Sequence, residues 1–288
     1  TDCLQEMKSI KTKASQIFEG KTCDDRAPKV TKISSPRLMQ ARTSKSDETV
    51  VCLGDQMKDT IDRLTRGSLE LDIISIIGMP GIGKTTLARK VYNDLRVERC
   101  FYFRAWCSVS QEYHKRDLLL EILSNDTGLK DGIHQMNDED LEMKLYQCLK
   151  NRKYLIVMDD VWDATAWREL QRAFPNDKNG SRILMTSRVS LEEAELKTNP
   201  YSLRPFSNDE SWKLLQMKIF HGDCPEELLE VGKEIAEKCK GLPLAIVAIA
   251  GLLERAEKKL KVWKTIAESL SSRIVDDRQT PCMEILLL

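Results

Sequence analysis

The residue pattern with the clearest chemistry is a glycine-rich stretch that ends in lysine and threonine. Residues 78–86 read Gly-Met-Pro-Gly-Ile-Gly-Lys-Thr-Thr, which fits the spacing of a phosphate-binding loop. Glycines let successive backbone amides turn toward phosphate oxygens, and the helix that follows directs its positive end at the same point. Lys84 adds a positive charge near the β and γ phosphates, and Thr85 offers a hydroxyl to Mg²⁺. The stretch predicts a site for a nucleoside diphosphate or triphosphate.

Two further groups of polar residues follow apolar stretches and could complete such a site. Asp159 and Asp160 come directly after residues 155–158. A triphosphate site needs a carboxylate at a strand end for Mg²⁺, so we predict that Asp159 holds the metal and Asp160 orients or deprotonates the attacking water. Arg188 follows residues 181–186. Because ligands bind beyond the carboxyl ends of parallel strands, we predict that Arg188 contacts the γ phosphate.

A parallel sheet is needed to bring these strand ends together. Short apolar or β-branched stretches predict strands at residues 71–77, 102–107, 154–158, 181–186 and 201–203. Helical patterns lie between them, and the repeat of Leu87, Val91 and Leu95 predicts that the helix after the phosphate loop extends to Leu95. The expected fold class is α/β, a P-loop NTPase sheet with helices on both faces.

Only helical patterns follow the sheet. Residues 207–210 form a capping box that opens a helix to about Phe220. Pro225 stands where a first helical residue is favoured, and Gly241 stops that helix near residue 240. Two more helices are expected at residues 242–254 and 260–270. Four helices joined by short loops predict a four-helix bundle.

These patterns divide the chain into five regions. They are an amphipathic helix at 1–20, a linker at 21–47, a nucleotide-binding domain at 48–204, a helical domain at 205–275 and the start of another domain at 276–288. The first helix is either the end of a coiled-coil domain or a surface helix of the main domain. Because the chain starts without methionine and ends in an apolar run, we expect it to be a piece of a longer protein.

The composition argues against several classes of protein. The 288 residues include 45 basic and 45 acidic side chains, so no global field attracts nucleic acid or an anionic membrane. Nine scattered cysteines without a C-x-x-C pair favour free thiols in a reducing compartment, and three separated histidines do not predict a metal site. No apolar stretch is long enough to span a bilayer. We therefore expect a cytoplasmic protein that binds no nucleic acid.

Five motifs in their order resemble the NB-ARC class of STAND ATPases, the nucleotide-binding core of plant immune receptors with leucine-rich repeats. The motifs are residues 78–86, 103–110, 155–162, 180–188 and the Gly-Leu-Pro-Leu of 241–244. The resemblance covers about residues 48–288. It implies a nucleotide-binding domain, a four-helix ARC1 domain and a winged-helix ARC2 domain, of which the third and the repeats lie beyond Leu288.

The resemblance also implies roles for single residues. Those that bind phosphates would be Gly81, Ile82, Gly83, Lys84, Thr85 and Thr86, with Mg²⁺ at Thr85 and Asp159. Arg188 would contact the γ phosphate of ATP, and Leu242 and Pro243 would pack on the adenine. Asp160 stands where related ATPases often carry Glu, and its shorter side chain implies slow hydrolysis.

The adenine edge would be bonded by the backbone of Val51. In this chain Cys52 and Leu53 replace the Gly-Phe that usually follows, so the segment departs from the family pattern.

The function implied by the resemblance is an ADP/ATP switch of a disease-resistance receptor. ADP would hold a closed form, and exchange for ATP would favour opening, oligomerisation and defence signalling. Expected partners are the nucleotide, the winged helix and repeats of the same receptor, and a pathogen effector or another receptor, whereas this piece is expected to be monomeric.

Two alternatives follow from the residues themselves. A P-loop kinase would need an acceptor pocket and lid arginines, which the helical region does not supply in recognisable form. A nucleotide-free interaction scaffold would not need the intact Lys84, Thr85 and Asp159.

Overall fold

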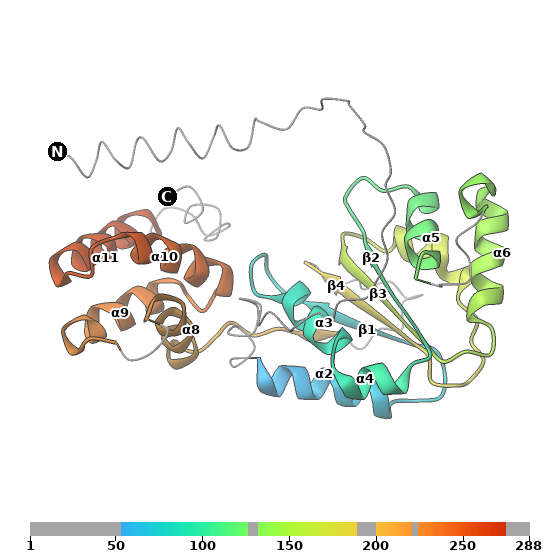
Figure 1. The fold of residues 1–288 in the computed structure, drawn as a ribbon, viewed down its shortest axis with the longest axis horizontal. Helices are drawn as coiled ribbons and strands as arrows, with labels where there is room; N and C mark the ends of the chain where they lie inside the picture. Colours follow the sequence, from blue (N-terminus) through green and yellow to red (C-terminus); the bar gives the residue numbers. More distant parts are fainter. Residues whose placement is uncertain (1–52, 126–131, 189–199, 221–223, 275–288) are drawn as a thin grey trace, which may run out of the picture.

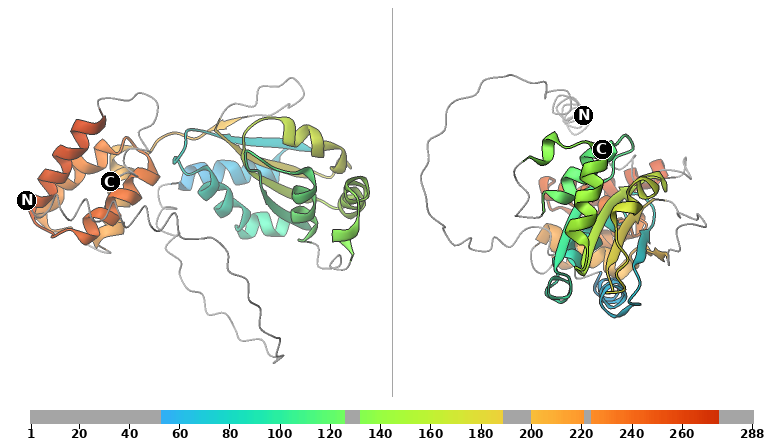
Figure 2. Two further views of the ribbon diagram at one scale, coloured as in Figure 1. Left: turned by 90° about the horizontal axis from the view of Figure 1, so that it is seen from above. Right: turned by 90° about the vertical axis from the view of Figure 1, so that its right-hand side faces the viewer.

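The computed structural model describes residues 53–125, 132–188, 200–220 and 224–274. A five-stranded parallel sheet is followed by four helices, which lie at one end of the sheet beyond the segment after β5 (Figures 1 and 2). The expected first helix and linker, Val51, and residues 276–288 lie outside the described residues. Within the described part, no helix is long and apolar enough to cross a bilayer.

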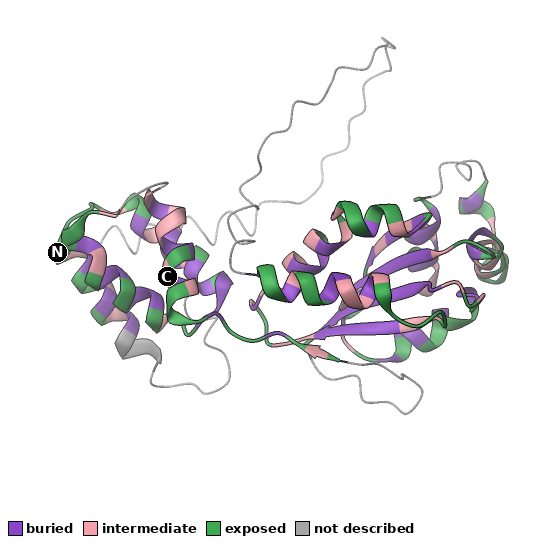
Figure 3. Cartoon of the chain, turned by 90° about the horizontal axis from the view of Figure 1, so that it is seen from below, coloured by how far each residue is buried: buried purple, intermediate pink, exposed green. Residues whose placement is uncertain are grey.

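The strands form where the apolar stretches predict them. They are β1 (Asp72–Ile77), β2 (Phe103–Ser108), β3 (Tyr154–Val161), β4 (Arg182–Ser187) and β5 (Tyr201–Ser202), in the order β2-β3-β4-β1-β5. Neighbours pair in parallel, so β1, β3 and β4 end at the same edge of the sheet. The central strands are buried along their length (Figure 3), because helices cover both faces.

Alternating side chains of the strands enter two separate cores. The helices of this part are α2 (Gly54–Arg66), α3 (Lys84–Tyr92), α4 (Leu95–Cys100), α5 (Lys115–Leu123), α6 (Asp138–Leu149) and α7 (Thr165–Leu170), with short 3₁₀ turns at Ile133–Gln135 and Gln171–Ala173. Leu155 and Val157 of β3 belong to the core beneath α2, α3 and α4, whereas Ile156 and Met158 belong to the core beneath α5, α6 and α7. The predicted fold class is confirmed.

The helix after the phosphate loop is shorter than predicted. It ends at Tyr92, and the carboxylate of Asp94 accepts a hydrogen bond of 2.9 Å from the amide of Arg96 to cap α4. Asp and Asn compete with helix continuation through such local bonds. Leu95 is 63% exposed as the first residue of α4. The prediction that one helix extends to Leu95 was therefore wrong.

The four later helices agree with their capping signals. They are α8 (Asn208–Phe220), α9 (Glu226–Lys238), α10 (Pro243–Arg255) and α11 (Leu260–Ile274). The capping box is confirmed, since Ser207 N donates to Glu210 Oε2 at 2.7 Å and Glu210 N donates to Ser207 Oγ at 3.2 Å. Pro225 is the residue before α9 rather than its first.

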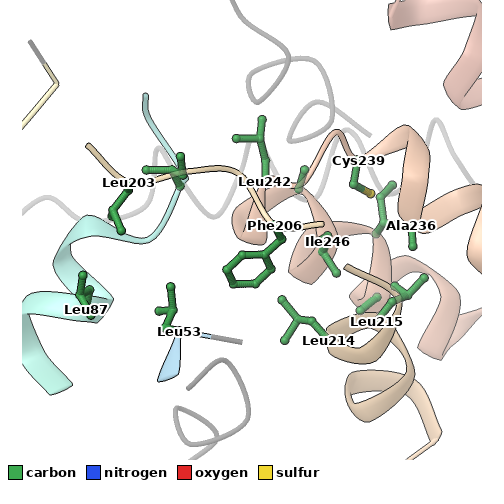
Figure 4. Close-up of a cluster of buried hydrophobic side chains, with 14 of the residues drawn as sticks. Leu53, Leu87, Leu203, Phe206, Leu214, Leu215, Ala236, Cys239, Leu242 and Ile246 are labelled. Carbon is green, nitrogen blue, oxygen red and sulfur yellow. The ribbon is translucent and has the colours of Figure 1, made fainter. Parts of the chain in front are cut away.

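One core joins the sheet to the bundle. Leu53 and Leu87 on the sheet side and Leu242 on the bundle side belong to the same buried cluster, with Phe206 between the two parts (Figure 4). Phe206 N donates to the carbonyl of Gly241 at 2.9 Å. This shared core holds α10 close to the phosphate loop. The domain boundary at residues 204 and 205 stays a prediction.

The described cysteines and histidines take no part in a cluster. Five cysteines of the described part form no disulfide, and three of these are buried, as apolar packing groups are. His114 and His134 are exposed, and His221 lies outside the described residues. Among the described residues, no group of His, Cys, Asp and Glu side chains could hold a metal ion by itself.

Candidate functional site

The phosphate loop connects the end of β1 to the start of α3. Gly81 and Gly83 have φ angles of 77° and 102°, which L side chains rarely adopt. The helix begins at Lys84. These two glycines bend the chain so that the first amides of α3 face the loop, where the positive end of the helix favours an anion.

Lys84 occupies the centre of this loop. Its ammonium donates to the carbonyl oxygens of Gly78 at 2.7 Å and Met79 at 3.2 Å, and its side chain is buried. Burial lowers the pKa of Lys84, and the nearby carboxylate of Asp160 opposes that shift. A charge held on the inner side of a loop of amides suits the phosphates of a nucleotide.

Asp159 and Thr85 meet at the end of the sheet. Thr85 Oγ1 donates to Asp159 Oδ1 at 2.9 Å, and Asp159 is only 6% exposed. Hydroxyl and carboxylate oxygens are the ligands that Mg²⁺ prefers. The hydroxyl of Thr85 and the carboxylate of Asp159 both lie beside Lys84 in the cleft. The residues present therefore fit a magnesium ion.

Asp160, near the end of β3, and Arg188, which follows β4, face one another. The guanidinium donates from Nε to Asp160 Oδ1 at 3.3 Å and from Nη2 to Oδ2 at 3.4 Å. The ring of Trp162 lies 4.2 Å from the guanidinium carbon. Each side chain of the pair is 42% exposed, so the pair contributes little to stability. The arrangement keeps an orientable cation and a carboxylate next to the loop.

A cleft of about 670 Å³ joins these groups to the bundle. Its lining consists of Pro80, Gly81, Gly83, Lys84, Thr85, Thr86, Ser108, Asp159, Asp160, Arg188, Pro243, Leu244 and Val247. The amide of Leu244 donates to the carbonyl of Gly81 at 3.2 Å, so the first turn of α10 lies directly against the phosphate loop. One wall of the cleft is charged and comes from the sheet, whereas the other is apolar and comes from the bundle.

The phosphate loop and the carboxylates of Asp159 and Asp160 occur in a stretch that matches a known family model. Residues 54–224, more than half of the chain, match the NB-ARC domain. The chain belongs to the NB-ARC family. This assignment confirms the predicted nucleotide-binding module.

Two plant relatives match nearly the whole of this NB-ARC chain and are much longer. The late blight resistance protein homolog R1B-14 of Solanum demissum is 40% identical over 280 residues, which cover 96% of this chain and 21% of that protein. Late blight resistance protein R1-A of the same plant is 38% identical over 279 residues, with the same two shares. The chain spans about a fifth of the length of these relatives.

Solved structures agree on the fold of the NB-ARC chain. Cdc6p of Pyrobaculum aerophilum is 14% identical, with a TM-score of 0.52 and coverage of 76% of this chain and 64% of that chain. The ADP form of the ORC2 protein of Aeropyrum pernix is 17% identical, with a TM-score of 0.51 and coverage of 80% and 69%. At such identities the likeness establishes the fold.

The structure brings together most of the predicted site residues. Those that line the cleft are Gly81, Gly83, Lys84, Thr85, Thr86, Asp159, Asp160, Arg188 and Pro243. Ile82 and Leu242 are 1% and 3% exposed in the shared core and do not line it. A role in nucleotide binding stays a prediction for each of these residues, and for Val51.

Sequence reasoning missed four lining residues, namely Pro80, Ser108, Leu244 and Val247. Ser108 could have been found, because it ends β2 directly beside Asp159 in the sheet register. Leu244 and Val247 carried no usable signal, since α10 is apolar on most of its faces.

Proposed function

We propose that this NB-ARC chain is the ADP/ATP switch module of a disease-resistance receptor. The observation that carries the proposal is the two-sided cleft, in which Lys84 and Asp159 face Pro243 and Leu244 from the bundle. A nucleotide with its phosphates at the loop and its base toward α10 touches both parts at once. Its binding energy then depends on how the two parts are arranged, which is what a switch requires.

Different residues of the chain would bind the phosphates, the base and the metal ion. Amides of the phosphate loop and the ammonium of Lys84 hold the phosphates, and Pro243 and Val247 offer apolar contact to the base. Thr85 and Asp159 would hold Mg²⁺, which when bound neutralises charge on the β and γ phosphates. Arg188 is placed to exchange its bond to Asp160 for one to a γ phosphate.

Hydrolysis by this arrangement should be slow. Asp160 has a shorter side chain than the Glu that related ATPases often carry at this position, so its carboxylate reaches less far toward an attacking water. A slow step suits a protein whose bound nucleotide reports a state.

The switch needs more than this chain. Moving a two-state equilibrium from 1:99 to 99:1 takes about 5.5 kcal/mol of differential binding. One charged hydrogen bond at Arg188 contributes roughly 1.5–3 kcal/mol. The rest comes from a winged helix, leucine-rich repeats or neighbouring subunits of a longer cytoplasmic receptor, which responds to a pathogen effector or another receptor.

The nucleotide released from purified protein tests this proposal. The protein is denatured and the supernatant is separated by chromatography. We expect ADP at close to one per chain with negligible turnover of added ATP. Rapid ATP consumption that depends on an acceptor would instead support a phosphotransferase, and an empty site would support a scaffold.

Asp160→Ala should separate turnover from binding. The substitution removes the group that orients the attacking water but leaves the phosphate loop intact. We expect ATP turnover to fall about tenfold, below the usual effect of a general base because the short side chain of Asp160 reaches the attacking water less well, with ADP affinity unchanged. Single-turnover kinetics and calorimetry measure the two quantities. Equal losses in both would mean that Asp160 is structural.

A further inference from the structure

Thr186, the fifth residue of β4, links the carboxylate of Asp159 to the backbone of Asp160 without lining the cleft. Its hydroxyl donates to Asp159 Oδ1 at 2.6 Å and accepts from the backbone amide of Asp160 at 2.8 Å. Its side chain is 1% exposed. A single buried hydroxyl therefore contacts both neighbouring residues that the proposed function uses.

The hydroxyl compensates for an irregularity of the sheet. Met158 pairs with Met185 and Val161 pairs with Ser187, so two residues of β3 oppose Thr186 alone. Such a bulge removes regular ladder bonds and bends the strand. The amide of Asp160 finds its partner in the side chain of Thr186 instead of a backbone carbonyl.

The backbone of Asp160 adopts a conformation that neighbouring hydrogen bonds must stabilise. Its φ angle is 57°, a left-handed conformation that is uncommon outside glycine. Residues in such conformations persist when surrounding bonds hold them, and they gather at functional sites. Here the bend turns the carboxylate of Asp160 toward Arg188.

The same hydroxyl also orients Asp159. Because the oxygen of Thr186 accepts the Asp160 amide, its only proton is available for Asp159. Thr85 of α3 and Thr186 of β4 both donate to Oδ1 of that carboxylate. Two donors on one oxygen fix the plane of the carboxylate more firmly than one.

We propose that Thr186 is a positioning residue for the metal site and for the attacking water. It sets the orientation of Asp159 toward Thr85 and stabilises the bend that aims Asp160. The proposal rests on the proposed nucleotide function. Groups that orient metal ligands in this way typically change metal affinity by about 10-fold to 100-fold when they are removed.

Thr186→Val, which keeps the shape and removes the hydroxyl, tests the proposal. We expect the Mg²⁺ concentration for half-maximal tightening of ATP binding to rise about tenfold. ADP affinity measured with EDTA should be unchanged, because the hydrogen bonds of Thr186 go to Asp159 and Asp160, which hold no phosphate in the proposed site. Thr186→Ser, which restores a hydroxyl, should return the Mg²⁺ requirement to that of the parent protein.

A matched control comes from the neighbouring strand. Ser75 on β1 is 1% exposed, and its hydroxyl has no hydrogen-bond partner in the described part of the chain. Ser75→Ala should therefore leave the Mg²⁺ requirement unchanged. Should Thr186→Val fail to fold, Thr186→Ala removes the hydroxyl without placing a methyl group against the carboxylate.

The Mg²⁺ requirement of the Thr186 variants distinguishes the possible roles of this residue. A selective rise in the Mg²⁺ requirement with rescue by Ser supports the proposal. An unchanged requirement, an equal loss of ADP affinity in EDTA, or failure of Ser to rescue would overturn it. If the parent protein itself binds no nucleotide, the proposed function fails, which is a separate result from the failure of Thr186 to position the site.

Discussion

Lys84→Ala should lower the affinity for ADP about 100-fold, because a charged hydrogen bond to phosphate contributes roughly 1.5–3 kcal/mol. The ammonium is buried inside the loop and directed by the carbonyls of Gly78 and Met79, so no other cation of the loop can replace it. Lys84→Arg should also lower occupancy, since a planar fork does not fill the place of a compact ammonium. Isothermal titration calorimetry on nucleotide-free protein measures both losses.

The control for this loss is Lys58→Ala. Lys58 is exposed on α2 and does not line the cleft, so its removal changes the net charge by the same amount without touching the loop. Its ADP affinity should match that of the parent protein. Unchanged affinity in Lys84→Ala would mean that the nucleotide does not occupy the phosphate loop.

Gly241→Ala should be the most destabilising single change in the junction between sheet and bundle. Gly241 has a φ of 70°, and an added Cβ would lie 2.3 Å from the carbonyl oxygen and 2.8 Å from the amide nitrogen of Phe206. Both atoms are backbone and cannot rotate away. We expect the free energy of unfolding to fall by about 3 kcal/mol or more, through the left-handed conformation and the lost bond to Phe206 together. Thermal denaturation measures the change.

Gly251→Ala gives a control of opposite sign. Gly251 lies inside α10, and no described atom beyond its chain neighbours and the backbone of its own helix lies within 4 Å of the position of its added Cβ. Alanine there should raise the free energy of unfolding by about 0.5–1 kcal/mol, because it restricts the unfolded chain and favours helix. If both variants lost stability, or neither did, the close contact between Gly241 and the backbone of Phe206 would not be what limits residue 241 to glycine.

Much of the charged wall of the cleft could be predicted, because the sequence patterns that indicate its residues are local. Apolar strands of β-branched residues end at the polar residues of 159–160 and 188, and parallel pairing places those ends together. The loop glycines and Lys84 depend on backbone geometry within nine residues. The same local reasoning found the capping box of α8.

The parts that could not be predicted depend on contacts between distant segments. The role of Gly241 was read as a helix stop, but its close approach to Phe206 appears only when the two segments are packed. Leu242 was expected at the adenine, whereas Leu244 and Val247 line the cleft. When a helix is apolar on most faces, the spacing of its apolar residues does not predict which face enters the core and which lines a cleft. Thr186 gave no signal because a bulge depends on the register of two strands.

One bound nucleotide should touch both the phosphate loop and the bundle. Hydrogen exchange measured by mass spectrometry, on protein stripped of nucleotide and then saturated with ADP, detects contact with each part separately. We expect slower exchange in peptides covering residues 78–86 and in peptides covering 243–248, with no change in α6 (residues 138–149), which is far from the cleft lining. Slower exchange in the loop alone would contradict the claim, since the nucleotide would then be held by the sheet without the bundle.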